Sequence, residues 1–170
     1  ATAFESLHSM VVTDANGIIL RVNRAFTRMT GYKPDEVIGR TPALFKSGRH
    51  DAAFYVGMWQ SLADRGAWFG EIWDRRKNGE VYPMLQSISA VRGDDGKVTH
   101  YVAASSDISE RKEAEEKIRH LAFYDPLTRL PNRRLLHDRL QRALVTGVRR
   151  HRPGALLVID LDDFKTLNDT

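Results

Sequence analysis

Acidic side chains gather near the C-terminal end of the sequence, directly after an apolar run. The run extends from Ala155 to Leu161, and Asp160, Asp162 and Asp163 lie at its end. A nearly continuous apolar run is typical of a strand buried on both faces, so we expect these carboxylates at a strand end. Magnesium prefers hard oxygen ligands and binds nucleotides through one or two carboxylates together with phosphate oxygens. The pattern therefore favours a metal-assisted nucleotide site at Asp160, whereas the side chains of Asp162 and Asp163 are expected to be solvated.

Composition limits the other metal and redox chemistry of the chain. A calcium loop of the EF-hand type requires glycine at its sixth position, where this sequence has Lys165. The 170 residues include no cysteine, which excludes disulfides, thiolate zinc sites and photochemistry that depends on cysteine. His50 is a conceivable haem ligand, but a lone histidine between Arg49 and Asp51 is more typical of a surface or capping residue. Haem binding is therefore not expected.

The net charge of +4 is unevenly distributed, because residues 132–152 carry seven arginines and the single acid Asp138. Nucleic-acid binding would favour interleaved aromatic residues or a recognition motif, and this segment has neither. We interpret the arginines as a solvated helix face and expect no nucleic-acid partner. No apolar run approaches the roughly 18 residues that cross a bilayer, and the N-terminus lacks a secretion signal. We expect a cytoplasmic piece of a larger protein without membrane contact of its own, which leaves an upstream anchor open.

Most of the sequence has the pattern of an α+β domain. Two β-branched runs, Met10 to Thr13 and Ile18 to Val22, flank an Asn-Gly turn and predict a hairpin. Short helices capped by Asn23 and opened by Pro34 should follow, and apolar spacing predicts a longer helix from Asp51 to Arg65. Three further strands are predicted over Trp68 to Arg76, Glu80 to Val91 and Val98 to Ser106. We expect a five-stranded antiparallel sheet with the short helices on one face and the other face free for a partner.

The chain should change character at Asp107, where Ser109 can cap a highly charged helix over residues 110–120. A turn at Asp125 and Pro126 and a helix over residues 132–145 follow, and residues 149–154 should form a loop before the apolar strand. We therefore expect an α+β domain over residues 1–108, a linker helix over 109–122 and the start of a second α/β domain over 123–170.

The linker helix carries a short heptad pattern. Ala114 and Leu121 share one heptad position, and Arg111 and Ile118 share another. Two heptads are fewer than the three or four that indicate a coiled coil. Two interpretations stay open: a parallel dimer seam through Ala114, Ile118 and Leu121, or a solvated tether.

Local signatures relate the first part to a known family. They are VTDANGIILRVNRAF (Val12 to Phe26), MTGYKPDEVIGR (Met29 to Arg40), MWQSLADRGAWFGEIWDRRKNGEVY (Met58 to Tyr82) and SDISERK (Ser106 to Lys112). In order and content, the first 112 residues resemble the PAS superfamily of sensory domains. The resemblance implies a pocket between the sheet and the helices that holds flavin, haem, another small ligand or nothing.

The candidate pocket residues are Trp59, Trp68 and Asp74. Light-sensing LOV relatives need a cysteine near residues 41–46, which this chain lacks. Redox flavin relatives typically have asparagine where this sequence has Asp74, and an ionised carboxylate only accepts hydrogen bonds. For the pocket we therefore favour an unidentified ligand, or no ligand, over flavin.

The tryptophans also have structural interpretations. For Trp59 and its neighbour Met58, a place in the apolar stripe of the helix is favoured over ligand contact. Trp68 and Trp73 should face opposite sides of their strand, so that one lines the pocket and the other a dimer surface, with core packing as the alternative.

Two motifs in the last part are similar to the opening of a GGDEF domain: DPLTRLPNRR (Asp125 to Arg134) and DLDDFKTLND (Asp160 to Asp169). The resemblance implies a magnesium site at Asp160 and the Leu161 carbonyl, phosphate contacts from the N–H groups of Asp163, Phe164 and Lys165, and a guanine contact from Asn168. The implied reaction joins two GTP molecules, one from each of two facing domains, by attack of a ribose hydroxyl on the α-phosphorus.

Together the resemblances imply a sensory and dimerisation module of a cyclic di-GMP signalling protein. The GG(D/E)EF signature does not occur in this sequence, so we expect no synthesis by the fragment itself. The intact protein is expected to be an active diguanylate cyclase or a GTP-binding GGDEF protein that controls a phosphodiesterase domain. A homodimer through the PAS domain and the linker helix is the expected partner arrangement.

Overall fold

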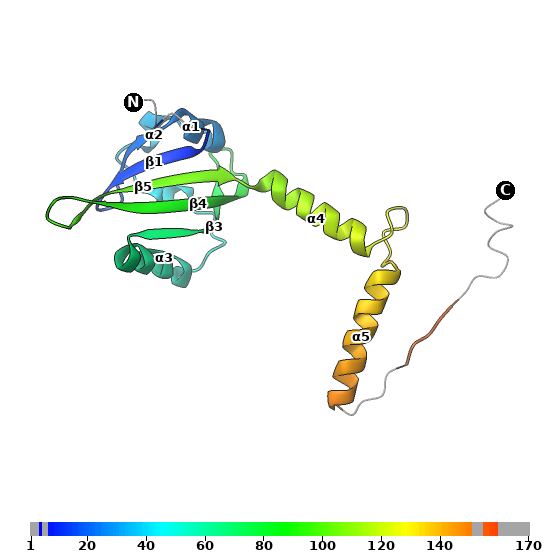
Figure 1. Cartoon of the computed structure of the whole chain (residues 1–170). Coiled ribbons are helices and arrows are strands. Elements are labelled where there is room, and N and C mark those ends of the chain that lie inside the picture. The colour runs from blue at the N-terminus through cyan, green and yellow to red at the C-terminus, as the bar shows by residue number, and fades with distance from the viewer. Residues whose placement is uncertain (1–3, 5–6, 151–154, 160–170) are drawn as a thin grey trace. The chain divides into compact units, whose positions relative to one another are not determined.

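The computed structural model describes residue 4 and residues 7–150 and 155–159. The chain divides into two compact units, Ala1–Ala114 and Glu115–Thr170. Figure 1 shows the sheet and short helices of the first unit and the helices α4 and α5 that follow it along the chain. Among the described residues, no helix combines the length and the apolar character needed to cross a membrane.

A five-stranded antiparallel sheet with the order β2-β1-β5-β4-β3 forms the first unit, which confirms the predicted α+β class. The strands are β1 (Ser9–Asp14), β2 (Ile19–Val22), β3 (Ala67–Arg75), β4 (Val81–Arg92) and β5 (Val98–Asp107). Gly17 adopts a φ of 80° in the first hairpin, a conformation that glycine reaches without the cost of a side chain. The predicted hairpin and the three later strands are therefore confirmed.

Over the described residues 23–66, four helices connect β2 to β3, and two of them, α1 and α3, begin and end at the residues expected from capping chemistry. The four are α1 (Arg24–Thr30), α2 (Pro34–Val37), η2 (Pro42–Phe45) and α3 (Ala52–Arg65). Asn23 and Asp51 accept a hydrogen bond from Phe26 N–H and Phe54 N–H, and glycines in the left-handed region end α1 and α3. Residues next to the helix ends thus determine where α1 and α3 begin and end.

The core of the unit lies between the sheet and these helices. One cluster joins β1, β2, α1 and η2 through Val11, Ile19, Val22, Phe26, Val37 and Phe45. A second joins β3 and β4 through Ile72, Tyr82 and Met84, and α3 packs against it. In Figure 1, α1 and α2 lie beside β1 and β2, whereas α3 lies beside β3. The two helix groups leave the middle of the sheet between them.

Two helices and a tight turn make up most of the described part that follows. They are α4 (Ser109–Phe123), which spans the division between the units, and α5 (Arg133–Arg150). Helix α5 continues through residues 149 and 150, where we expected a loop, because the sequence has no proline between Pro131 and Pro153. Asn132 caps this helix by accepting hydrogen bonds from the N–H groups of Arg134 and Leu135.

The strand predicted from Ala155 to Leu161 is not present over residues 155–159. Leu157 and Val158 are each 81% exposed in this segment. A strand forms only where its backbone groups pair with a neighbouring strand, and the described residues of the second unit contain no other strand. This prediction was wrong for the described residues. An apolar pattern indicates that a segment can be buried, but it does not show that a neighbouring strand is present to pair with it.

Candidate functional site

A cavity of about 270 Å³ lies in the middle of the first unit, between the sheet and the helices. Every second residue of the sheet strands points into it: Ser9, Val11 and Thr13 of β1, Ile72 and Asp74 of β3, Tyr82, Met84, Gln86 and Ile88 of β4, and Tyr101, Ala103 and Ser105 of β5. The helices complete the wall with apolar side chains such as Phe26, Phe45, Met58 and Leu62. A concave apolar pocket with few polar groups is the usual form of a small-molecule site.

Asp74 is the acidic group of this wall and is only 8% exposed. Within the described part of the chain, no hydrogen bond or ion pair reaches its carboxyl group. Burial raises the pKa of Asp74 to about 7, because the charged form loses its hydration. With a pKa of about 7, the protonated carboxyl group can also donate near neutral pH, beyond the accepting role expected of the ionised carboxylate.

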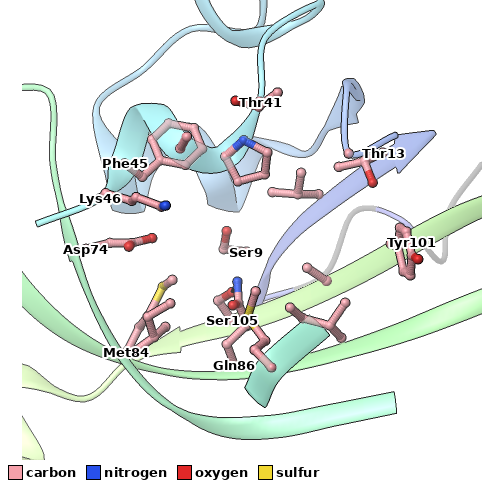
Figure 2. A pocket seen from close by; sticks show the side chains of 18 of the residues that line it. Ser9, Thr13, Thr41, Phe45, Lys46, Asp74, Met84, Gln86, Tyr101 and Ser105 are labelled. Carbon is pink, nitrogen blue, oxygen red and sulfur yellow. Dashed lines mark hydrogen bonds between the residues drawn. The ribbon is translucent and has the colours of Figure 1, made fainter. Parts of the chain in front are cut away.

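Lys46 stands at the same end of the cavity as Asp74 (Figure 2), and Tyr55, which also lines the cavity, contacts Lys46. The backbones of Lys46 and Asp74 form a β-bridge, and the Lys46 ammonium lies 4.0 Å from the centre of the Tyr55 ring. The Tyr55 hydroxyl has no hydrogen-bond partner in the described part of the chain, and burial raises its pKa, with a further contribution from the charge of Asp74. This end of the cavity therefore combines a cation, an acid and a free hydroxyl group.

The floor of the cavity carries a second polar group of residues, on the neighbouring strands β1, β5 and β4. Gln86 Nε2 donates to Ser105 Oγ at 3.1 Å. Ser9, which is 3% exposed and pairs with Ser105 in the sheet, has a hydroxyl without a partner among the described residues. Sequence reasoning missed Ser9, Lys46, Tyr55 and Gln86. For Ser9 and Gln86, the alternation along the strands was the available signal, because it assigns them the same face as Val11 and Met84.

The candidate tryptophans occupy different places. Trp59 lines the cavity and is 46% exposed, with its ring edge-on to Tyr101 at 5.4 Å, and this partial exposure differs from the burial of its neighbour in the apolar stripe of α3. Met58, at 8% exposed, does lie in the core as well as on the cavity wall. Trp59 is therefore positioned to contact both a ligand and solvent.

Trp68 lies outside the lining of this cavity. Its ring packs edge-on against Phe54 at 5.9 Å and covers Gly70, where an added Cβ would come within 2.7 Å of Trp68 Cζ2. The missing side chain of Gly70 thus gives the Trp68 ring its place against α3. Trp73 faces the other side of the strand, where the Arg49 guanidinium covers it at 3.9 Å.

His50 does not line the cavity. Its Nε2 accepts a hydrogen bond from the Trp73 N–H at 2.9 Å, and its ring stacks on Phe54 at 3.9 Å. The nitrogen that would bind a haem iron already has a backbone partner.

A chain of contacts leads from the cavity to the start of α4. Tyr82, which lines the cavity and is 2% exposed, lies beneath the Arg76 guanidinium at 3.7 Å. Arg76 pairs with Asp107, and Asp107 accepts from the Ser109 N–H at 2.8 Å. Burial alone would raise the pKa of Asp107, but the hydrogen bonds from Arg76 and Ser109 outweigh it and hold the pKa below its usual value.

The assignment of Ser109 as the cap of the linker helix needs correction. Ser109 is the first residue of α4, and the Asp107 carboxylate is the acceptor for its N–H. An aspartate that is already fixed by Arg76 supplies this acceptor without further loss of side-chain freedom. Further along α4, Ile118 is 67% and Leu121 55% exposed, and the helix has no buried residue, Ala114 included.

The second unit contains an ordered turn at the first of its two motifs. Asp125 accepts from the N–H and the hydroxyl of Thr128, both at 2.8 Å, and these bonds lower its pKa. Arg129 adopts a φ of 58° within the same turn. The magnesium and nucleotide candidates, Asp160, Leu161, Asp163, Phe164, Lys165 and Asn168, lie outside the described residues.

Comparison with protein-family models finds two matches. Residues 7–110 match the PAS domain, and residues 122–170 match the diguanylate cyclase, GGDEF domain.

Relatives among curated proteins include a nitrogen fixation regulatory protein of Klebsiella oxytoca, 29% identical over 89% of this chain and 27% of that protein. The cyclic di-GMP phosphodiesterase PdeR of Escherichia coli is 30% identical over 97% of this chain and 25% of its own length. The bifunctional diguanylate cyclase/cyclic di-GMP phosphodiesterase MucR of Pseudomonas aeruginosa is 48% identical over 33% of this chain and 8% of that protein. The chain thus spans about a quarter of the length of the first two relatives.

Solved structures share the fold of the first unit. The PAS domain of a protein from Colwellia psychrerythraea superposes with a TM-score of 0.61 at 22% identity, covering 65% of this chain and 94% of that one. An RNA-binding light-oxygen-voltage receptor superposes with a TM-score of 0.63 at 28% identity, covering 71% and 35% of the two chains.

Proposed function

The chain belongs to the PAS domain family and continues into the beginning of a GGDEF domain, and from this premise we propose that it senses a small ligand and controls cyclic di-GMP turnover. The observation that carries the proposal is the apolar cavity of about 270 Å³ with an unpaired acid on its wall. A cavity that served packing alone would not be expected to retain a buried carboxyl group without a partner.

The signal is proposed to leave the cavity through Tyr82, Arg76 and Asp107. Each contacts the next, and Asp107 holds the first N–H of α4. Lys112, one turn into α4, also pairs with Glu71 of β3. A ligand that shifts Tyr82 would therefore act on the end of β5 and on the direction in which α4 leaves the sheet.

Dimerisation is proposed to use α4 and the outer face of the sheet. The exposed Ile118 and Leu121 would form the seam with Ala114, and Phe69, 70% exposed on the outer side of β3, would contact the second copy. In a parallel helix pair, the phase of the seam sets how the two following domains face each other.

The GGDEF part is proposed to bind magnesium and GTP through Asp160, the Leu161 carbonyl, the N–H groups of Asp163, Phe164 and Lys165, and the Asn168 amide. This assignment is supported by the match over residues 122–170. A module that works with GTP belongs in the cytoplasm, where we place it.

Diguanylate cyclase activity of the intact protein is the first candidate for the output. Control of a phosphodiesterase is the second, favoured by the similarity to PdeR, which extends over 97% of this chain. Replacing Asp160 by alanine in the intact protein separates them: cyclic di-GMP synthesis should disappear if the domain is a cyclase. Wild-type synthesis by that variant would contradict the metal assignment.

The ligand is proposed to be a small organic molecule and not a haem. Flavin is the alternative, supported by the structural similarity to the light-oxygen-voltage receptor. The visible absorption spectrum of freshly purified protein distinguishes the two, because a stoichiometric flavin band near its usual wavelengths would establish flavin.

Cavity sensing is tested in the intact protein by filling the cavity. Ala103→Leu adds a larger side chain to the wall, whereas Ala104→Leu places the same side chain on the opposite face of β5. The first variant should lose the ligand-dependent change in cyclic di-GMP level, and the second should keep it. If both variants respond like the wild type, the cavity is not the sensor.

Transmission is tested by insertions after Lys117. Seven residues restore the heptad phase, and four rotate the seam by about half a heptad. The seven-residue insertion should keep the basal output and the four-residue insertion should change it. Equal output from both would identify α4 as a tether.

A further inference from the structure

Three polar groups of the cavity wall have no hydrogen-bond partner within the described part of the chain: the Asp74 carboxyl and the hydroxyls of Ser9 and Tyr55. Asp74 is 8% exposed and Ser9 3%. Buried polar groups are nearly always paired in native proteins. The unpaired groups are therefore available to hydrogen-bond atoms of a ligand.

The cavity wall offers one acidic acceptor and several donors. Above its pKa of about 7 the Asp74 carboxylate only accepts, and in Figure 2 it faces the cavity next to Lys46. Lys46 donates, and the hydroxyls of Tyr55 and Ser9 can donate as well. A matching ligand edge needs N–H groups toward Asp74 and an oxygen acceptor toward the neighbouring donors.

The size and the walls of the cavity limit the body of the ligand. An engineered protein cavity of about 150 Å³ holds benzene, so about 270 Å³ suits a body of one or two rings. Phe26, Phe45 and Tyr82 provide aromatic surface, and Met58 and Met84 are adaptable side chains. A flat, largely apolar heterocycle fits these walls.

We propose that the cavity binds a small neutral heterocycle whose edge carries two adjacent N–H donors followed by a carbonyl, the edge of the 2-amino-4-oxo pyrimidines. Its two N–H groups bond the two oxygens of the Asp74 carboxylate, and its carbonyl accepts from Lys46, Tyr55 or Ser9. The proposal rests on the sensory role of the cavity given above and names the class of ligand.

Other ligand edges fit the acid less well. An anionic ligand would bring a second negative charge toward Asp74, and an imide edge would place a carbonyl oxygen against the carboxylate. Two parallel N–H···O bonds to a carboxylate are among the stronger hydrogen-bond arrangements in proteins. Because the pKa of Asp74 is about 7, such a ligand should bind more tightly at pH 8 than at pH 6. The other ionisable groups that face this end are Lys46, Tyr55 and Tyr82, and burial keeps both tyrosines protonated by raising their pKa.

Two probes that differ by one amino group test the proposal on the 170-residue chain. 2-Aminoquinazolin-4(3H)-one carries the full donor pair, and quinazolin-4(3H)-one lacks the amino donor. Calorimetric titration at pH 8 should give at least about tenfold tighter binding of the amino compound, since one hydrogen bond to a charged group is gained. Asp74→Asn should remove this preference, because an amide offers one acceptor and one donor. Asp64→Asn, on the exposed face of α3, is the matched control and should keep it.

The outcomes separate the ligand class from the sensory function. Equal or tighter binding of quinazolin-4(3H)-one by the wild type overturns the proposed class, as does failure of both probes to bind, while the Ala103→Leu test still decides whether the cavity senses. The sensory function is contradicted only if the Ala103→Leu variant of the intact protein keeps the ligand-dependent response of the wild type.

Discussion

The two units place an asparagine at the start of a helix in the same way but in different surroundings. Asn23 accepts from Met10 N–H and Phe26 N–H, donates to the carbonyls of Phe4 and His8, and is 2% exposed. Asn132 caps α5 with the same amide chemistry and donates to the Ala122 carbonyl at 3.0 Å, but it is only partly buried. Helix capping depends on residues next to the helix end, whereas burial of the capping residue requires a second layer of structure above it.

The apolar side chains show the same difference. Leu62 of α3 is 1% exposed because the sheet covers it, whereas Leu144 of α5 is 61% exposed. Both helices are amphipathic; the sheet of the first unit covers the apolar face of α3, whereas the described residues of the second unit contain no sheet. A family motif can therefore be identified in a segment whose described residues build no core of their own.

Hydrogen exchange should reveal the largest difference between the units. Amides of β4 and β5 in the middle of the sheet should exchange at least about a thousandfold more slowly than those of residues 155–159, because only the former require sub-global opening. Exchange of the native chain followed by mass spectrometry measures this. Similar protection of both segments would contradict the contrast between a covered and an uncovered unit.

Leucine truncation should give the next largest effect. Leu62→Ala should lower the free energy of unfolding of the first unit by about 3 to 5 kcal/mol, because it removes a fully buried side chain. Leu144→Ala, the control on an exposed helix face, should change stability by less than about 0.5 kcal/mol. Urea unfolding followed by tryptophan fluorescence measures the first unit, whose tryptophans are Trp59, Trp68 and Trp73, and circular dichroism follows the helices of the second. Equal losses would mean that α5 is covered in solution.

Asp74→Asn should change the pH dependence of stability. Because the folded pKa is raised from 3.8 to about 7, the folded state binds the proton more tightly, and wild-type stability should fall as pH rises from about 4 to 7. At pH 8 the variant should therefore be more stable than the wild type by about 2 to 4 kcal/mol, and the gain should vanish toward pH 4.

Asp125, in the second unit, should give the opposite pH dependence of stability. Hydrogen bonds from Thr128 lower its pKa, so its contribution is present above the unfolded pKa and is lost as pH falls through the folded one. Thermal unfolding over about pH 2 to 8 for Asp74→Asn and Asp125→Asn checks both directions, because the Asp125 contribution is lost below its unfolded pKa of 3.8. A parallel pH dependence of wild type and Asp74→Asn would show that the Asp74 carboxyl is not desolvated.

The two capping asparagines should give the smallest difference. Asn23→Ala should cost about 2 kcal/mol, because it leaves buried backbone groups of β1 and α1 unpaired. Asn132→Ala should lower the helix content of α5 and cost about 0.5 to 1 kcal/mol, since water can reach the freed groups. Circular dichroism of both variants measures this, and a larger effect at Asn132 would reverse the comparison.

Sequence patterns predicted most of the first unit correctly because its signals are local. Asn23, Asp51 and the glycines at 31 and 66 mark helix ends through backbone conformation and capping, which depend on neighbouring residues only. The errors arose where a partner was needed. Ser109 has its acceptor in Asp107, which Arg76 holds from another strand, and residues 155–159 have no strand beside them among the described residues.

The candidate site was predictable only in part. Asp74 and Trp59 were found from the family resemblance, but the resemblance placed Trp68 with them, and Gly70 and Phe54 hold that ring outside the cavity. Neither the place of Lys46 over Tyr55 nor the unpaired hydroxyl of Ser9 follows from any local pattern, since these residues lie on different elements.

The order of the elements, the helix ends of α1 and α3 and the family of both parts follow from residues close together in the chain. The chemistry of the cavity depends on how distant segments pack. Ser9, Lys46, Tyr55 and Asp74 are up to 65 positions apart, and the fold brings them to the wall of one cavity, where Ser9 and Asp74 are buried. Desolvation by distant segments raises the pKa of Asp74 to about 7 and leaves its carboxyl group facing the cavity without a partner in the described part of the chain.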